Sequence, residues 1–289
     1  MFQGSIVALV TPFQKGKVDQ DALQNLVSWQ CAQGTEGLMI CGSTGEGTLL
    51  TPQERGLIIS LVKEAAGKTP VIVGCGSPST ADVITMAEEA KRLGADGILV
   101  VTPYYVKPTQ RGLYQHFASV SHAVDIPMIV YNNPGRASVE ISVDLLLELS
   151  ELENVVAIKD STNDLGRPAL MRSRLKRDFK LLCGDDPFTS AYLAQGGDGC
   201  ISITGNVVPN LCYQLIAAWK NRDLETFGDL TKKLIALHVA LVSEVNPCPV
   251  KYALSAMGKI QNELRLPLLP ATAATMDRVN QALTTMGVL

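Results

Sequence analysis

The stretch VVAIKDST at residues 155–162 indicates how this chain folds and raises a chemical question. Its first four residues are apolar and continuous, which is typical of a strand buried on both faces in a parallel sheet. Lys159 follows directly at the end of this run. Because burying an unpaired ammonium group is unfavourable, a lysine in this position needs either an ionic partner or a chemical role.

Runs of the same kind recur along the whole chain, mostly rich in Val and Ile and bounded by Gly, Pro, Thr or Asn. Segments with helical periodicity separate them, and several begin with a capping residue, such as Thr51, or end on a glycine, such as Gly34. This alternation predicts a parallel sheet covered by helices. The expected strands are 5–13, 37–43, 70–76, 97–103, 127–134, 155–161, 179–186 and 199–206.

Eight strand and helix units in about 220 residues fit a closed (β/α)8 TIM barrel. A doubly wound open sheet is the structural alternative. Because helical pattern continues after the eighth unit, we expect a catalytic barrel over residues 1–225 and a C-terminal helical extension over residues 226–289. A bend and a second helix of the extension are expected at 246–258.

The composition limits the classes of function. Of the 289 residues, 46% are hydrophobic and 18% charged, and the net charge is −3, so the chain can form a large core and has no field that attracts nucleic acid or anionic membrane. The basic stretch at 172–180 is interpreted as a solvated helix end. No apolar run reaches the roughly 18 to 20 residues that span a bilayer, and a basic signal region is absent, so we expect a soluble cytoplasmic protein.

Seven cysteines and three histidines are scattered along the chain, without a CxxC pair or a metal-binding motif. We therefore expect buried free thiols, no metal and no cofactor.

In a barrel of this kind the active site lies at the C-terminal ends of the strands. Strand parity places Val155, Ala157 and Lys159 on one face and Val156 and Ile158 on the other. The bulky Val156 and Ile158 suit the helix layer, and the small Ala157 leaves room inside the barrel. Lys159 is therefore expected to point into the barrel mouth.

A partly desolvated lysine favours the neutral amine, which condenses with a carbonyl to form a Schiff base. A structural ion pair of Lys159 with Asp160 or Glu46 is the alternative interpretation.

Other strand ends carry groups that suit such chemistry. Tyr131 can transfer protons during imine formation, or it can fill the top of the barrel with its hydroxyl bonded to the backbone. The GSTGEG segment at 42–47 clusters backbone N–H groups and hydroxyls that suit a carboxylate, or it forms only a tight turn. Arg136 suits a second carboxylate, or it is a solvated loop arginine.

Together these residues resemble a known family. The chain is similar to the pyruvate-dependent class I aldolases and, among them, most to the dihydrodipicolinate synthase family, essentially from end to end. The resemblance implies a condensation of pyruvate with L-aspartate semialdehyde through a lysine Schiff base, giving 4-hydroxy-tetrahydrodipicolinate in the diaminopimelate route to lysine. It lies in the segments GSTGE (42–46), TPYY (102–105), YNNPGR (131–136), IKDS (158–161), CGDD (183–186) and NPCPVK (246–251).

The resemblance also implies roles for single residues. Lys159 would form the Schiff base, and Tyr131, Ser43 and Tyr105 would form a proton relay. Tyr105 would come from a neighbouring subunit, because family members are usually homotetramers built as dimers of dimers. The implied substrate-binding residues are Thr44 for the pyruvate carboxylate, Arg136 for the semialdehyde carboxylate, and the backbone at Gly184 and Ile201.

The chain departs from the family pattern at several positions. Ser43 stands where Thr is usual, which keeps the hydroxyl with a freer rotamer. In lysine-inhibited members an Asn and a Glu would fall at Pro78 and Asp82, and some carry histidines at the positions of Pro52 and Arg55. We therefore expect weak or absent inhibition by L-lysine.

Two other functions stay open from the sequence. One is a sister aldolase, either N-acetylneuraminate lyase or a 2-keto-3-deoxy sugar acid aldolase, but Arg136 suits a short substrate with a carboxylate better than a polyhydroxylated sugar. The other is a catalytically idle homologue that binds a keto acid, which the intact set of Lys159, Tyr131 and Tyr105 argues against.

Overall fold

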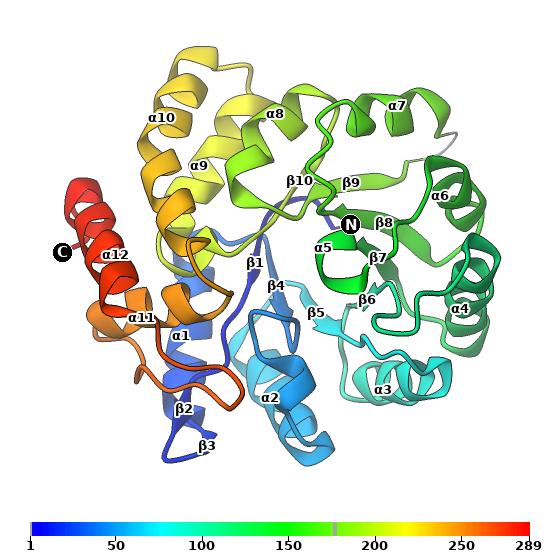
Figure 1. Cartoon of the computed structure of the whole chain (residues 1–289), viewed down its shortest axis with the longest axis horizontal. Coiled ribbons are helices and arrows are strands. Elements are labelled where there is room, and N and C mark those ends of the chain that lie inside the picture. Colours follow the sequence, from blue (N-terminus) through cyan, green and yellow to red (C-terminus); the bar gives the residue numbers. More distant parts are fainter. Residues whose placement is uncertain (1, 176–177) are drawn as a thin grey trace.

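The computed structural model describes residues 2–175 and 178–289. Eight parallel strands close into a barrel, in which each strand pairs with the next along the chain and β10 pairs with β1 (Figure 1). The predicted (β/α)8 barrel is therefore confirmed, and the open sheet is excluded. The strands are β1 Gly4–Ala8, β4 Gly37–Ile40, β5 Val71–Gly74, β6 Gly97–Val101, β7 Met128–Asn132, β8 Val155–Asp160, β9 Lys180–Cys183 and β10 Gly199–Ser202.

Helices surround the barrel, and their ends follow the predicted capping signals (Figure 1). Thr51 and Glu54 form a capping box at the start of α2, and Gly34 follows α1 with a φ of +90° that favours glycine. The helices around the barrel are α1 Gln20–Ala32, α2 Pro52–Ala65, α3 Thr80–Arg92, α4 Gln110–Ala123, α5 Pro134–Ala137, α6 Val143–Ser150, α7 Arg167–Arg174, α8 Thr189–Ala194 and α9 Pro209–Lys220, with short 3-10 turns at η1 Gly47–Leu49, η2 Asp186–Phe188 and η3 Thr204–Asn206.

A small antiparallel hairpin that the sequence did not predict lies between β1 and α1. Its strands are β2 Phe13–Gln14 and β3 Lys17–Val18. Lys15 and Gly16 both have positive φ, as a two-residue hairpin turn requires. Their backbone N–H groups donate hydrogen bonds of 2.8 and 2.6 Å to the Glu263 carboxylate, which ties the hairpin to the C-terminal part of the chain.

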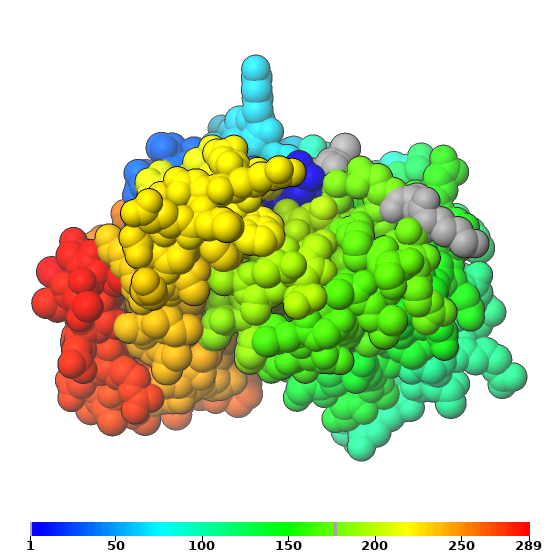
Figure 2. Space-filling view, turned by 90° about the horizontal axis from the view of Figure 1, so that it is seen from above, coloured from blue at the N-terminus to red at the C-terminus, as the bar shows by residue number. Residues whose placement is uncertain are grey.

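Three helices follow the barrel: α10 Leu224–Leu241, α11 Cys248–Ala256 and α12 Ala273–Met286. They lie together on one side of the molecule, coloured from yellow to red in Figure 2. The first of them begins two residues before the expected boundary at residue 226. The predicted bend and second helix at 246–258 are confirmed by α11.

The interior of the barrel and the layer between strands and helices form two separate apolar clusters. As predicted, Ala157 faces the interior and Ile158 faces the helices. The prediction is wrong for Val155, which packs in the helix layer, and for Val156, which packs against the interior cluster. The reason is a β-bulge, because Met128 of β7 pairs with Val155 while Ile129 pairs with Ala157, so that Val156 is the extra residue.

The remaining expectations concern the cysteines, the basic stretch and membrane segments. All seven cysteines are free, and Cys31 alone among them is only partly buried. Helix α7 ends at Arg174, where the sequence predicted a helix end, and Lys176 and Arg177 of the basic stretch lie outside the described residues. No helix in the described ranges has the length and apolar character that crossing a bilayer requires.

Candidate active site

A cavity of about 940 Å³ opens where the strands end. Its wall is built from the loops that follow the strands and from the segment between α10 and α11. The structure therefore brings most of the predicted site residues together. Those that line the cavity are Ser43, Thr44, Tyr131, Arg136, Lys159 and Gly184.

Lys159 lies in the cavity wall at the end of β8 and is only 5% exposed. It pairs with Tyr131 on the neighbouring strand β7, and its Nζ lies 4.3 Å from the centre of the Tyr131 ring. Strand parity correctly predicted this inward direction. The bulge at Val156 precedes Lys159, and the expected alternation of side chains is restored from Ala157 onward.

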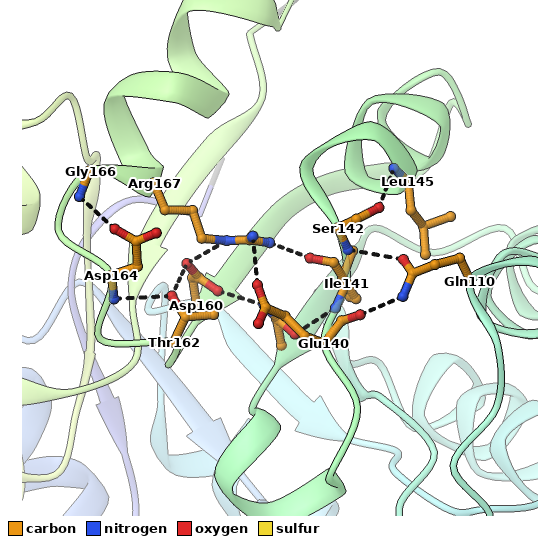
Figure 3. A network of polar contacts seen from close by, with 11 residues as sticks. Gln110, Glu140, Ile141, Ser142, Leu145, Asp160, Thr162, Asp164, Gly166 and Arg167 are labelled. Atoms are coloured by element: carbon orange, nitrogen blue, oxygen red, sulfur yellow. Dashed lines mark hydrogen bonds and ion pairs between the residues drawn. The ribbon is translucent and has the colours of Figure 1, made fainter.

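Neither carboxylate that the sequence offered as an ionic partner of Lys159 is available to it. The Asp160 carboxylate lies 3.1 Å from Nε of Arg167 and accepts a 2.9 Å hydrogen bond from the Asn132 amide. Figure 3 shows Asp160 inside this network, which continues from Arg167 to Glu140. Burial raises the pKa of the Asp160 carboxyl, and the charge of Arg167 opposes this rise.

The other candidate, Glu46, is paired with Lys251 of α11 at 2.5 Å, and both side chains are fully buried. The interpretation of Lys159 as a structural ion pair with Asp160 or Glu46 is therefore wrong, since both carboxylates are committed to other cations.

The Tyr131 hydroxyl is held by a residue that the sequence analysis missed. The Asn133 side-chain amide donates a 2.7 Å hydrogen bond to this hydroxyl, and its oxygen accepts from the Arg136 backbone N–H at 3.1 Å. Asn133 is thus the N-cap of α5 and also orients the tyrosine. The sequence signal for the cap was present, because Asn before Pro134 is typical of a helix start. The ring of Tyr131 does fill the top of the interior cluster, but its hydroxyl bonds to a side chain.

A second missed residue, Asn246, comes from the extension. Its amide donates a 2.9 Å hydrogen bond to the Thr44 hydroxyl, and its backbone carbonyl accepts from an Arg136 guanidinium nitrogen at 3.5 Å. The two predicted carboxylate-binding side chains therefore meet at one residue more than 100 positions away from both. Its only signal in the sequence was its place in the NPCPVK segment.

The GSTGEG segment is both a tight turn and part of the cavity wall. Glu46 has a φ of +52°, and a Cβ at Gly47 would lie 1.9 Å from the Cys41 carbonyl oxygen. Thr44 is buried, whereas Ser43 is exposed at the rim. The close fold of this turn fixes both hydroxyls beside the cavity.

Two of the predicted residues, Tyr105 and Ile201, lie outside the cavity wall. Tyr105 is 91% exposed with a φ of +71° and, unlike its neighbour Tyr104, is not part of the cavity wall. Ile201 is fully buried in the interior cluster of the barrel and also lies outside the cavity wall. Gly184 is held against β8, since its N–H donates to the Asp160 carbonyl at 2.8 Å and a Cβ there would lie 2.0 Å from the Ser161 hydroxyl.

Within the described ranges, no group of three or more His, Cys, Asp or Glu side chains is placed to hold a metal ion.

The chain is similar to known proteins over its whole length. A model of the dihydrodipicolinate synthetase family matches residues 1–286. The 4-hydroxy-tetrahydrodipicolinate synthase of Rhodospirillum centenum is 48% identical over 290 residues, which cover 100% of both chains. The crystal structure of dihydrodipicolinate synthase from Aquifex aeolicus is 42% identical with a TM-score of 0.97 and covers 99% of each chain. The chloride-inhibited enzyme of that name from Acinetobacter baumannii, complexed with pyruvate, is 40% identical with a TM-score of 0.97 and covers 100% of each chain.

Proposed function

The chain belongs to the dihydrodipicolinate synthetase family and is a lyase that condenses pyruvate with L-aspartate semialdehyde to 4-hydroxy-tetrahydrodipicolinate, and we propose that Lys159 carries this reaction as a Schiff base. The condensation belongs to lysine and diaminopimelate biosynthesis. The observation that supports Lys159 most strongly is its burial in the cavity wall beside Tyr131, while Asp160 and Glu46 pair with other cations.

In the first step, the amine of Lys159 attacks the keto carbon of pyruvate. A C–N bond forms, the keto oxygen leaves as water, and the imine remains. The oxygen needs a proton to leave, and the hydroxyl of Tyr131, whose ring centre lies 4.3 Å from Lys159 Nζ, supplies it. The hydrogen bond from Asn133 orients this hydroxyl.

In the second step, the protonated imine loses a methyl proton to the relay and becomes an enamine, whose carbon attacks the aldehyde carbon of L-aspartate semialdehyde. The aldehyde oxygen gains a proton from the relay of Tyr131, Ser43 and Tyr105. The amine of the substrate then attacks the imine carbon, the bond from that carbon to Lys159 breaks, and the ring closes with the lysine released as an amine.

The substrate carboxylates need their own donors. Thr44 accepts a hydrogen bond from Asn246, so its own O–H is free to donate to the pyruvate carboxylate together with the backbone at Ser43. Arg136 can bind the semialdehyde carboxylate in a bidentate manner. The backbone at Gly184 and Ile201 completes the proposed substrate contacts.

We further propose a homotetramer built as a dimer of dimers that acts in the cytoplasm. A tyrosine that is 91% exposed cannot belong to a proton relay unless a partner covers it, and Val106 beside it is also exposed. Tyr105 would therefore complete the site of a neighbouring subunit. The seven free thiols fit a reducing compartment.

Borohydride trapping tests the proposal. Incubation with pyruvate and borohydride should leave one reduced adduct, located at Lys159 by mass spectrometry, and the Lys159→Ala variant should form none. Pyruvate consumption should follow addition of L-aspartate semialdehyde and not of N-acetylmannosamine or glyceraldehyde. Consumption with a sugar alone would make the chain a sister aldolase, and a wild-type protein without any adduct would contradict the Schiff base.

A further inference from the structure

The proposed function leaves one group of the second substrate without a partner. L-Aspartate semialdehyde carries an aldehyde, a carboxylate and an α-amino group, and the last of these is an ammonium ion at neutral pH because α-amino groups titrate near pH ~8. The aldehyde faces the enamine, and the carboxylate faces Arg136. An ammonium ion that enters a partly desolvated cavity needs an acceptor of opposite charge.

Most carboxylates in the cavity wall already serve other groups. Glu46 is paired with Lys251, and the Glu244 carboxylate accepts a 3.1 Å hydrogen bond from the backbone N–H of Thr272. The full set of carboxylate residues in the wall is Glu46, Asp82, Glu89, Asp185 and Glu244.

Two further members of this set belong to α3. Asp82 is exposed in its first turn, and Glu89 lies 3.8 Å from Arg92 on the same helix. Asp185 is the remaining carboxylate, and it lies two residues after the end of the barrel strand β9 at Cys183.

The surroundings of Asp185 suit a cation. It follows Gly184 at the end of β9, is partly buried, and lies in the same cavity wall as Lys159 and Arg136. No Lys, Arg or His side chain in the described ranges is within ion-pair distance of its carboxylate. Burial raises the pKa of the Asp185 carboxyl, and the charge of Lys159, a side-chain hydrogen bond with Ser161 and the charge of Arg136 oppose this rise.

The neighbouring Asp186 shows the contrast between the two acids of the CGDD segment. Its carboxylate accepts hydrogen bonds from the backbone N–H groups of Ile203 at 2.8 Å and Thr204 at 3.1 Å, and from the Ser202 hydroxyl. Asp186 is therefore structural, whereas Asp185 faces the cavity.

We propose that Asp185 accepts the α-ammonium group of L-aspartate semialdehyde, an assignment that rests on the function proposed above. The ammonium and carboxylate groups of this substrate are attached to the same carbon, so the acceptor must lie beside Arg136. The same nitrogen, once it has passed its extra proton to the Asp185 carboxylate, must attack the imine carbon on Lys159, so the acceptor must also lie near Lys159. Asp185 lies in the same cavity wall as both cations, and in this role it selects an aldehyde with an amino group over one without it.

Kinetics with paired substrates test this assignment. Succinate semialdehyde is L-aspartate semialdehyde without its amino group. A substitution that weakens binding of L-aspartate semialdehyde alone therefore reports on the ammonium contact. In Asp185→Asn, KM for L-aspartate semialdehyde should rise by about 10- to 100-fold, the range for a lost charged hydrogen bond. The inhibition constant of succinate semialdehyde and the borohydride-trapped pyruvate adduct should stay within about twofold of wild type.

Asp82→Asn is the matched control, since it removes the same charge from the α3 side of the cavity. It should leave KM for both aldehydes unchanged. Asp185→Ser serves as a second variant, and the pyruvate adduct shows for each variant that the site is folded. If Asp185→Asn weakened the binding of both aldehydes equally, or weakened the binding of neither, the role of Asp185 would be overturned. A wild-type protein that forms no pyruvate adduct would instead refute the function itself.

Discussion

At the residue scale, the orientation of Tyr131 depends on one neighbour. Asn133 holds the phenol oxygen while it also caps the short helix that carries Arg136. A single amide therefore links the group proposed to transfer protons to the group proposed to bind the second carboxylate.

Substitutions at these two residues should have different effects. Tyr131→Phe should lower kcat by about 10²- to 10⁴-fold, the usual contribution of positioned acid–base groups. Asn133→Ala should lower kcat less and also raise KM for L-aspartate semialdehyde, because the capping contact to Arg136 is lost. Steady-state kinetics separate the two effects, and an Asn133→Ala enzyme with unchanged constants would contradict the positioning role.

Single polar residues were the hardest part of the site to predict. Lys159 and Tyr131 could be predicted because strand ends point into a barrel mouth and parity gives the direction. Asn133, Asp185 and Asn246 lie in loops, where no periodicity reports the direction of a side chain.

At the element scale, β8 shows where sequence patterns stop being informative. Val155 and Val156 are both apolar and β-branched, so nothing in their chemistry shows which of them faces the helices. The register shift against β7 decides this, and pairing between strands is not visible in one strand alone. The barrel and its order of elements were predictable, because continuous apolar strands and helical periodicity are local signals.

The interior face of β8 gives a test of packing. Ala157 is fully buried in the interior cluster and pairs with Ile129 of β7, so Ala157→Leu should overpack the barrel and lower the free energy of unfolding by about 1 to 3 kcal/mol. Chemical denaturation measures this change. The control is Val156→Leu at the bulge, which is half-buried and should have a smaller effect, and equal effects would contradict this difference in burial.

The extension is joined to the barrel by a buried ion pair. Burial lowers the pKa of Lys251, and the charge of Glu46 opposes this. Lys251→Met should destabilise the protein by about 3 to 5 kcal/mol, because Glu46 remains buried without its partner. The double variant Glu46→Gln with Lys251→Met should recover part of that loss in denaturant titrations. A double variant less stable than Lys251→Met would show that the pair itself, and not the orphaned charge, carries the stability.

At the scale of the whole molecule, subunit mixing tests whether Tyr105 acts on a partner. Lys159→Ala and Tyr105→Ala proteins should each be nearly inactive alone. After they are unfolded together and reassociated, mixed dimers contain one intact site, so about one quarter of wild-type activity should return for random pairing. Lys159→Ala mixed with a Lys159→Ala, Tyr105→Ala double variant is the control and should stay inactive. If no activity returned in the mixture of Lys159→Ala and Tyr105→Ala, Tyr105 would not act in the site of a neighbouring subunit.

Feedback by L-lysine is expected to be weak or absent. Pro52 and Asp82 lie in the cavity wall, and Arg55, where some inhibited relatives carry histidine, is buried and donates a 2.7 Å hydrogen bond to the Gly74 carbonyl. An arginine here repels the ammonium groups of a lysine ligand. Activity measured over a titration of L-lysine to millimolar concentration should hardly change, and a normal inhibition curve would contradict this expectation.

The contacts between the extension and the GSTGEG segment at 42–47 have a consequence for protein synthesis. Thr44 meets Asn246 across 202 positions, and Glu46 meets Lys251 across 205 and the Arg265 backbone N–H across 219. A chain emerging from the ribosome folds its N-terminal part first, so the loop with Ser43 and Thr44 leaves the tunnel long before the residues that hold it. Catalytic competence therefore appears late, once Arg265 has also left the tunnel.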